Sequence, residues 1–212
     1  MSNGMITEAM LCALRAEVAA VLGDYRMAHT LGVEEMAAEL AALYCPEKTP
    51  LLRAAALLHD VTKELTEAEQ RAILDANGIT LRPDEAATPQ IWHAITAASV
   101  IPQRYAAFAL PELVSAVRWH ATGRVAMTLT EAIIYLADVI ERGRRFADCI
   151  ALREQFFGAD PAAMSMAERR RHLRDVLLLS YDKTVAKLQA RGQNVCLDTL
   201  YARDDLKNRS EF

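Results

Sequence analysis

Six residues of two chemical types are placed along the chain in an order that could form a metal site. They are His29, the adjacent pair His59 and Asp60, His93, His120 and Asp138. Four imidazoles and two carboxylates provide enough ligands for two metal ions, and such mixed sites commonly hydrolyse phosphate esters. The pattern therefore favours phosphoester hydrolysis, provided that the fold brings the six side chains together.

Three of these residues interrupt apolar sequence at two places in the chain, which makes them informative. Asp138 lies alone within the apolar run Ile133–Ile140, and His59 and Asp60 directly follow a run of alanine and leucine. Burying an unpaired polar group costs several kcal/mol, so each must find a partner. For Asp138 the partner is either a metal or Arg142, one helical turn further on.

The other histidines are weaker evidence when each is taken alone. A single histidine such as His29 is more often a hydrogen-bonded core or surface residue than a ligand. His93 follows a long polar loop, which could place it at the rim of a cavity. His172 lies in a charged run of arginines, so we leave it outside the site.

Basic and small residues near the candidate ligands suit phosphate groups. Lys63 lies one helical turn after His59, and Arg26 lies three residues before His29, so each can face the same cavity as its histidine. Thr122 and Gly123 follow His120 at a helix end, where free backbone amides and a hydroxyl could hold phosphate oxygens.

Composition predicts a helical protein with a packed core. The 212 residues fit one domain, 52% of them are hydrophobic and 25% are charged, and this composition favours a packed core over disorder. Aromatic residues make up only 6% and the net charge is −4, which disfavours general binding to nucleic acids. The four cysteines are scattered and are expected to be small buried thiols in a reducing cytoplasm.

Hydrophobic periodicity of about 3.6 residues covers nearly every segment, and no alternating strand pattern competes. We predict helices over residues 5–22 (capped at the end by Gly23), 24–44 (with Asp24 as its cap), 51–59, 66–76, 90–101, 111–120, 129–141, 161–190 and 197–206. Residues 80–89 should form a polar loop. The start of the chain shows neither a signal peptide nor a membrane span, so no membrane association is expected.

Five blocks of this sequence, in order, resemble the YqeK-like branch of the HD-domain phosphohydrolase superfamily. They are Arg26–Val33, Leu57–Lys63, His120–Gly123, Leu136–Glu141 and Thr199–Leu206. The resemblance implies an all-α HD domain spanning residues 1–212, with a core at about 24–145 and supporting C-terminal helices at 146–212. It also implies symmetrical cleavage of a small-molecule substrate, diadenosine tetraphosphate, into two ADP at a di-iron-type centre.

On this basis we expect His29, His59, Asp60 and Asp138 to hold one metal, and Asp60, His93 and His120 to hold the other. Asp60 would bridge the two ions, and a hydroxide that they share would attack an inner phosphorus. Lys63 and Arg26 would neutralise the transferred phosphoryl group, with Thr122, Gly123 and Arg144 on the remaining phosphates. Iron is expected, although manganese or cobalt would suit the same ligands.

Two positions depart from the family pattern, and two other functions stay open. Ala121 stands where the family usually has a second threonine, and Arg142 where it usually has proline. Another HD phosphohydrolase would act on nucleoside monophosphates, guanosine tetraphosphate or cyclic dinucleotides. A non-catalytic helical protein would use the metal structurally or as a nucleotide sensor. The oligomeric state, a homodimer included, is open.

Overall fold

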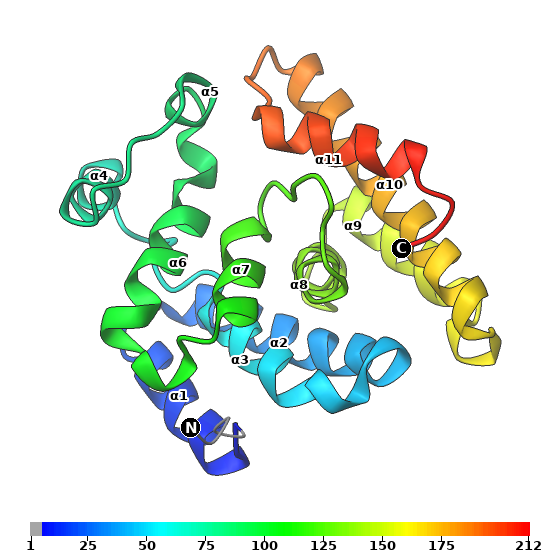
Figure 1. Ribbon diagram of the computed structural model, residues 1–212, viewed down its shortest axis with the longest axis horizontal. Helices are drawn as coiled ribbons and strands as arrows, with labels where there is room; N and C mark the ends of the chain where they lie inside the picture. Colours follow the sequence, from blue (N-terminus) through cyan, green and yellow to red (C-terminus); the bar gives the residue numbers. More distant parts are fainter. Residues whose placement is uncertain (1–5) are drawn as a thin grey trace.

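The computed structural model describes residues 6–212, and within that range the chain forms α-helices and short 3-10 turns with no strand (Figure 1). The eleven α-helices are α1 (Glu8–Ala19), α2 (Asp24–Tyr44), α3 (Thr49–Leu58), α4 (Glu67–Ala76), α5 (Pro83–Ala86), α6 (Trp92–Arg104), α7 (Pro111–Trp119), α8 (Leu129–Ile140), α9 (Ala147–Gly158), α10 (Met166–Ala190) and α11 (Leu197–Asn208). The all-α prediction is confirmed.

Helix α8 occupies the middle of the molecule and is seen nearly end-on in Figure 1. It packs against α2, α3 and α7 on one side and α9 on the other, while α10 and α11 run together along one edge. All eight residues from Thr130 to Ala137 are buried, because α8 is apolar on almost every face. No helix within residues 6–212 combines the length and apolarity needed to cross a membrane.

Side-chain caps explain where several helices begin. A capping box of Thr66 and Glu69 opens α4. Ser165 and Glu168 form an equivalent box at α10, so this helix starts at Met166 rather than at Pro161, and residues 161–163 form a separate 3-10 turn.

Other helix boundaries differ from the sequence prediction. The first helix ends at Ala19, and Met5, its expected start, lies outside the described residues. Gly23, not Asp24, occupies the cap position of α2, and its N–H donates to the carboxylate of Glu64 over 2.7 Å.

Two helices were not anticipated from the sequence. The short α5 lies within the predicted polar loop, and α9 buries only Leu152 and Phe156. Both have too few buried apolar residues to give a clear periodic signal.

The cysteines are all free thiols, but they are not all buried. Cys45 and Cys196 are buried and Cys149 is partly buried, whereas Cys12 is exposed on α1. The expectation of small buried thiols is therefore wrong for Cys12, which faces away from the core side of an amphipathic helix.

Candidate metal centre

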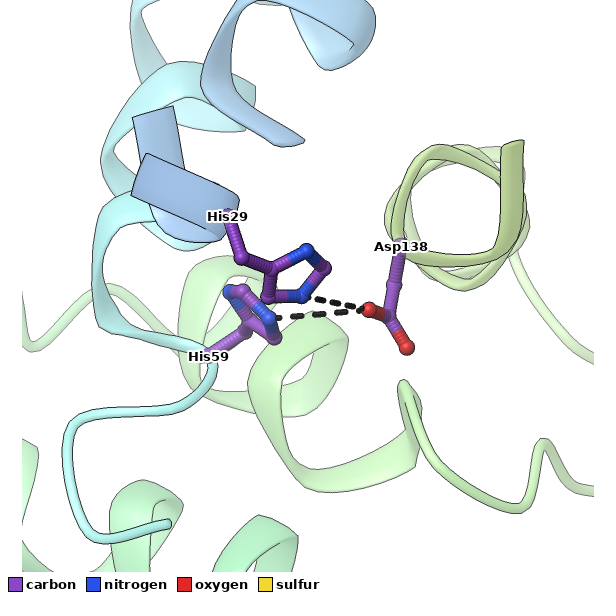
Figure 2. Close-up of side chains that lie close together, drawn as sticks. All are labelled: His29, His59 and Asp138. Atoms are coloured by element: carbon purple, nitrogen blue, oxygen red, sulfur yellow. Dashed lines mark ion pairs between the residues drawn. The ribbon is translucent and has the colours of Figure 1, made fainter. Parts of the chain in front are cut away.

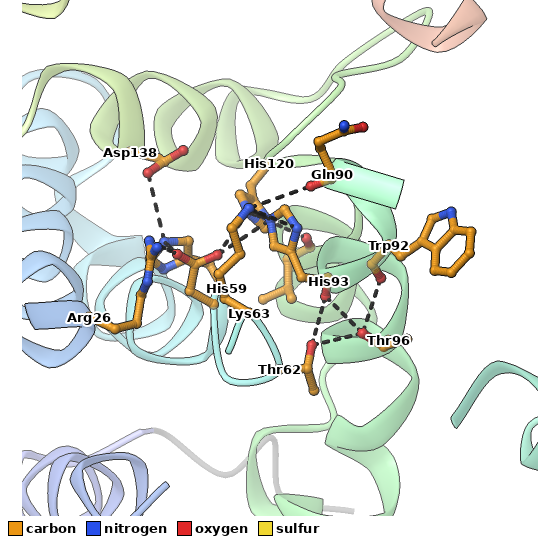
Figure 3. A network of polar contacts seen from close by, with 12 residues as sticks. Arg26, His59, Thr62, Lys63, Gln90, Trp92, His93, Thr96, His120 and Asp138 are labelled. Carbon is orange, nitrogen blue, oxygen red and sulfur yellow. Dashed lines mark hydrogen bonds and ion pairs between the residues drawn. The ribbon is translucent and has the colours of Figure 1, made fainter. Parts of the chain in front are cut away.

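The fold brings all six predicted ligands to one place. His29 comes from α2 and Asp138 from α8 (Figure 2). His93 comes from α6, while His59 and His120 follow the last residues of α3 and α7 (Figure 3). Asp60 directly follows His59. Asp138 is partly buried and the other five are buried. Helix ends and helix faces from across the chain thus supply the site.

One group of three ligands surrounds the carboxylate of Asp138. Oδ1 of Asp138 lies 2.9 Å from Nε2 of His29 and 3.8 Å from Nε2 of His59 (Figure 2). The three side chains are therefore close enough for each to give one ligand atom to the same metal ion.

A second group of three comprises His59, Asp60 and His120. Oδ2 of Asp60 lies 3.4 Å from Nε2 of His59, while Oδ1 lies 3.7 Å from Nε2 of His120 and 3.4 Å from Nε2 of His93. The two oxygens of Asp60 therefore face different imidazoles, as a bridging carboxylate would require.

In three of the histidines, the ring nitrogen Nδ1 points away from the site and forms a hydrogen bond with an acceptor. Nδ1 of His59 donates to the carbonyl of Ala56 over 2.6 Å, and Nδ1 of His120 donates to the carbonyl of Val117 over 2.7 Å. Because a carbonyl only accepts, Nδ1 carries the proton and the Nε2 lone pair faces inward. Such partners orient metal-binding imidazoles.

For His29 the equivalent partner is the carboxylate of Glu141. Oε1 of Glu141 lies 3.1 Å from Nδ1 of His29, and the Glu141 side chain is buried. The sequence pattern alone assigns Glu141 no role in the site. The signal that could have found it is its place beside Asp138 at the end of the most apolar helix.

One atom tests whether the site fits a metal. Nε2 of His59 is buried and has no hydrogen-bond partner. An unpaired buried acceptor is costly unless something binds it. Its lone pair faces Asp60 and Asp138, so the donor set fits a divalent transition metal such as iron, manganese or cobalt.

The electrostatics of the cluster keep its carboxylates ionised. Burial raises the pKa of Asp60, but His59, His120 and His93 outweigh it and hold this pKa well below its usual range. Burial also raises the pKa of Asp138, but Arg144 and His29 outweigh it and hold this pKa well below its usual value. Anionic oxygens are the form that binds a metal.

Three cations line a cavity of about 310 Å³ at the same place. Arg26 donates to Oδ2 of Asp60 over 2.7 Å, Arg144 donates to Oδ1 of Asp138 over 2.5 Å, and Nζ of Lys63 lies 3.0 Å from Nδ1 of His93. All three predicted basic residues thus reach the centre, where each presently contacts a candidate ligand.

The basic partner of Asp138 is Arg144 and not Arg142. Arg142 instead forms an ion pair with Glu39 over 2.7 Å. Helix α8 ends at Ile140, and Glu141 adopts an extended backbone, so helical spacing does not extend to Arg142. The turn that follows brings Arg144 back to the site.

The structure does not bring Thr122 and Gly123 into the lining of the cavity. The Thr122 hydroxyl donates to the carbonyl of Gly123 over 2.9 Å. Gly123 has a φ of +65°, and a Cβ there would lie 1.9 Å from the hydroxyl of Tyr181. A turn and close packing account for both residues, and their role on phosphate stays a prediction.

Sequence reasoning missed several lining residues. Tyr135 from α8, Thr184 from α10 and Gln90 all face the cavity. Thr184 belongs to a helix that the sequence suggested only as packing support.

The comparisons with known proteins agree with this geometry. The HD domain family matches residues 26–143, more than half of the chain. The chain belongs to the HD-domain family. The matched range ends close to the predicted core at 24–145, although the division into core and supporting helices stays a prediction.

Curated relatives cover most of the chain. It is 30% identical over 178 residues to the symmetrical bis(5'-nucleosyl)-tetraphosphatase of Bacillus subtilis (strain 168), covering 84% of this chain and 87% of that protein. It is 29% identical over 189 residues to the protein of the same name from Halalkalibacterium halodurans, covering 87% and 90%. The chain is therefore a homologue of these enzymes and an HD phosphohydrolase.

A solved structure shares the whole fold. The crystal structure of a predicted HD superfamily hydrolase involved in NAD metabolism from Clostridium acetobutylicum matches with a TM-score of 0.80 at 28% identity. The match covers 97% of this chain and 100% of that one, so the C-terminal helices belong to the shared architecture.

Proposed function

We propose that this HD phosphohydrolase cleaves diadenosine tetraphosphate symmetrically into two ADP, using two metal ions, most favourably iron. The observation that carries the proposal is the meeting of six ligand-type side chains, four of which line one cavity together with three cations. Support for the substrate comes from relatives, named as symmetrical tetraphosphatases, that align with most of the chain.

The side chains around the cavity can be given separate tasks. Bound metal would supply Lewis-acid activation of water and of the phosphoryl group. Lys63, Arg26 and Arg144 would neutralise the negative charge of the tetraphosphate, and a planar guanidinium can hold two phosphate oxygens at once. Ala56, Val117 and Glu141 hold the three imidazoles in the orientation that binding requires.

Substrate binding would release the two arginines from the carboxylates that they now contact. Arg26 pairs with Asp60 and Arg144 pairs with Asp138. With Asp60 and Asp138 committed to metal, each guanidinium would be free to turn towards the phosphates of a bound substrate. Positive charge would then lie on both sides of the reacting phosphorus.

The test combines metal analysis of the purified protein with identification of products. The proposal expects metal in the isolated protein and ADP as the sole nucleotide product from diadenosine tetraphosphate. Asp60→Asn should lose both metal and turnover. His172→Gln is the matched control, because His172 is a histidine outside the site that contacts the carbonyl of Phe156.

Other reaction products, or none, would support the alternative functions. Equal amounts of AMP and ATP would contradict symmetrical cleavage. Release of phosphate, pyrophosphate or a linear dinucleotide from other nucleotides, with diadenosine tetraphosphate left intact, would favour a different HD phosphohydrolase. Bound metal without turnover of any of these substrates would favour a non-catalytic protein.

A further inference from the structure

A second hollow lies beside the metal cavity. It has a volume of about 200 Å³, and its lining includes Tyr25, His29, Arg144 and Phe146. Arg144 also lines the metal cavity, and His29 is a candidate ligand. Arg144 is therefore shared by the linings of the two hollows.

Two aromatic rings in this hollow are unusually exposed. Tyr25 is 78% exposed and Phe146 is 58% exposed. Single exposed apolar residues are common on protein surfaces, but here two rings line one small hollow at the edge of a charged site. Neither ring is needed by the core, so packing does not explain their position.

Both rings are attached to backbone that the site itself holds in place. Tyr25 lies four residues before His29 on α2, so the two share a helix face. Phe146 lies two residues after Arg144, whose guanidinium donates to the carbonyl of Asp138 over 2.9 Å and to its carboxylate. The rings are thus positioned relative to the candidate ligands.

The charges around the hollow suit a nucleotide. Arg144 and Arg145 line it, and Nζ of Lys187 lies 5.6 Å from the centre of the Phe146 ring. The acidic residue in the lining is Glu141, but its carboxylate already contacts Nδ1 of His29 and the N–H of Gly143. Aromatic faces combined with cations are the usual means of binding a base and its phosphates without reading the sequence of bases.

We propose that Tyr25 and Phe146 form a stacking platform for one nucleobase of the substrate, whose phosphates pass Arg144 into the metal cavity. This inference rests on the proposed function, because it needs a nucleotide in the cavity. A symmetrical substrate has two equivalent ends, so either base can occupy the platform. The platform binds any purine through its ring face and leaves the hydrolysed phosphorus at the metal.

The experiment measures binding of ADP, its fluorescent 1,N6-etheno derivative and inorganic pyrophosphate to the protein as isolated. Stacking quenches the etheno fluorescence, so wild-type protein should quench it. Tyr25→Leu and Phe146→Leu should each weaken ADP binding roughly tenfold and reduce the quenching. Pyrophosphate has no base, so its affinity should be unchanged in both variants.

Two controls separate stacking from general damage. Tyr201 is also exposed, at 52%, but lies on α11 outside both hollows, so Tyr201→Leu should bind ADP normally. Tyr25→Phe keeps the ring and should retain quenching. In steady-state assays with diadenosine tetraphosphate, the leucine variants should raise KM much more than they lower kcat.

Wild-type quenching and ADP affinity that persist in both leucine variants would overturn the platform. An equal loss of pyrophosphate binding would also overturn it, since the rings would then act through the phosphate site. If the protein hydrolyses the tetraphosphate symmetrically but both leucine variants bind ADP like wild type, the proposed function is supported and the stacking platform is wrong. If ADP binding depends on the two rings but the protein does not hydrolyse the tetraphosphate, the stacking platform is supported and the proposed function is wrong.

Discussion

At the scale of single residues, Asp60 links the two halves of the candidate centre. One of its oxygens faces His59 and the other faces His93 and His120. The neighbouring cations lie outside the ligand cluster: Arg26 contacts Asp60 and Lys63 contacts His93, while Arg144 contacts both Asp138 and His29. This difference predicts that the ligands and the cations will respond differently to mutation.

Lys63→Ala should keep its metal and lose turnover. Lys63 contributes charge at the cavity, so its removal should lower kcat by about two to three orders of magnitude if it acts like one missing oxyanion donor. Metal analysis and kcat for diadenosine tetraphosphate measure the two effects separately. Lys207→Ala, on the surface of α11, is the control, and a near-normal kcat in Lys63→Ala would remove Lys63 from the mechanism.

Glu141→Gln should weaken metal binding although Glu141 is not itself a predicted ligand. The neutral amide would stabilise the N–H of His29 less than the carboxylate does, and weakening such a partner typically lowers metal affinity by up to about 10- to 100-fold. Competition with a chelator measures the affinity. Glu39→Gln removes a carboxylate that pairs with Arg142 instead, and the idea fails if both variants bind metal equally well.

At the scale of elements, the turn between α7 and α8 is held by packing from α10. The hydroxyl of Tyr181 on α10 lies against Gly123 and donates to Sδ of Met127 over 3.3 Å. His120 precedes this turn, so α10 indirectly supports a candidate ligand. The turn can therefore be tested for a structural role and a phosphate role at once.

Gly123→Ala should destabilise the fold more than Gly78→Ala does. Both glycines have positive φ, +65° and +64°, so each substitution should cost about 1–3 kcal/mol of backbone strain. Only Gly123 has a side chain in the way, whereas nothing lies within 4 Å of a Cβ at Gly78. Urea unfolding compares the two, and equal losses of stability would contradict the packing explanation.

The start of α11 is tied to the short helix α5 through Asp84. Its carboxylate accepts the N–H of Leu197 over 3.0 Å and pairs with Arg82. The bond from Arg82 is the main cause that holds the pKa of Asp84 below its usual range. A lowered carboxyl pKa makes the folded state more stable at pH values above the unfolded pKa.

Asp84→Asn should therefore be less stable than wild type at pH 7, and the difference should shrink as pH falls. The unfolded carboxyl titrates near pH 4, so the advantage of Asp84 begins to decline there and is lost as pH passes through the lower folded pKa. Urea unfolding of both proteins at pH 7, 5 and 3 measures the trend. A difference that is constant with pH would show that the charge of Asp84 is not responsible.

At the scale of the whole molecule, the candidate ligands join helices that are far apart in the chain. They span residues 29–138, and α10 adds Thr184 to the same cavity. Without metal the cluster places buried carboxylates, imidazoles and cations together, including the unpartnered Nε2 of His59. Metal should therefore bind the folded state far better than the unfolded chain.

Added metal should raise the melting temperature of metal-free wild-type protein. At a free Mn²⁺ or Co²⁺ concentration of 100 times Kd, the expected gain is about 2.7 kcal/mol. Scanning calorimetry with and without chelator measures it. Asp60→Ala should show little of this gain, and an equal shift in that variant would place the stabilising ion elsewhere.

The sequence by itself determined the helical class, and it singled out the six candidate ligands and the three basic residues that the fold brings together. Helical periodicity is a local property, so it survives without knowledge of the fold. It failed for α5 and α9, where few apolar residues are buried. Polar residues inside apolar runs, especially Asp138, could be recognised as candidates because a buried polar group needs a hydrogen-bonding, ionic or metal partner.

Which groups those residues contact was decided only by the tertiary structure. Arg144 rather than Arg142 reaches Asp138 because the backbone leaves the helix at Glu141. Glu141 became a partner of His29 through the packing of α2 on α8, 112 residues apart in sequence. Spacing along a helix predicts neighbours within that helix, whereas contacts after its end depend on turns and on packing between distant segments, which no local pattern encodes.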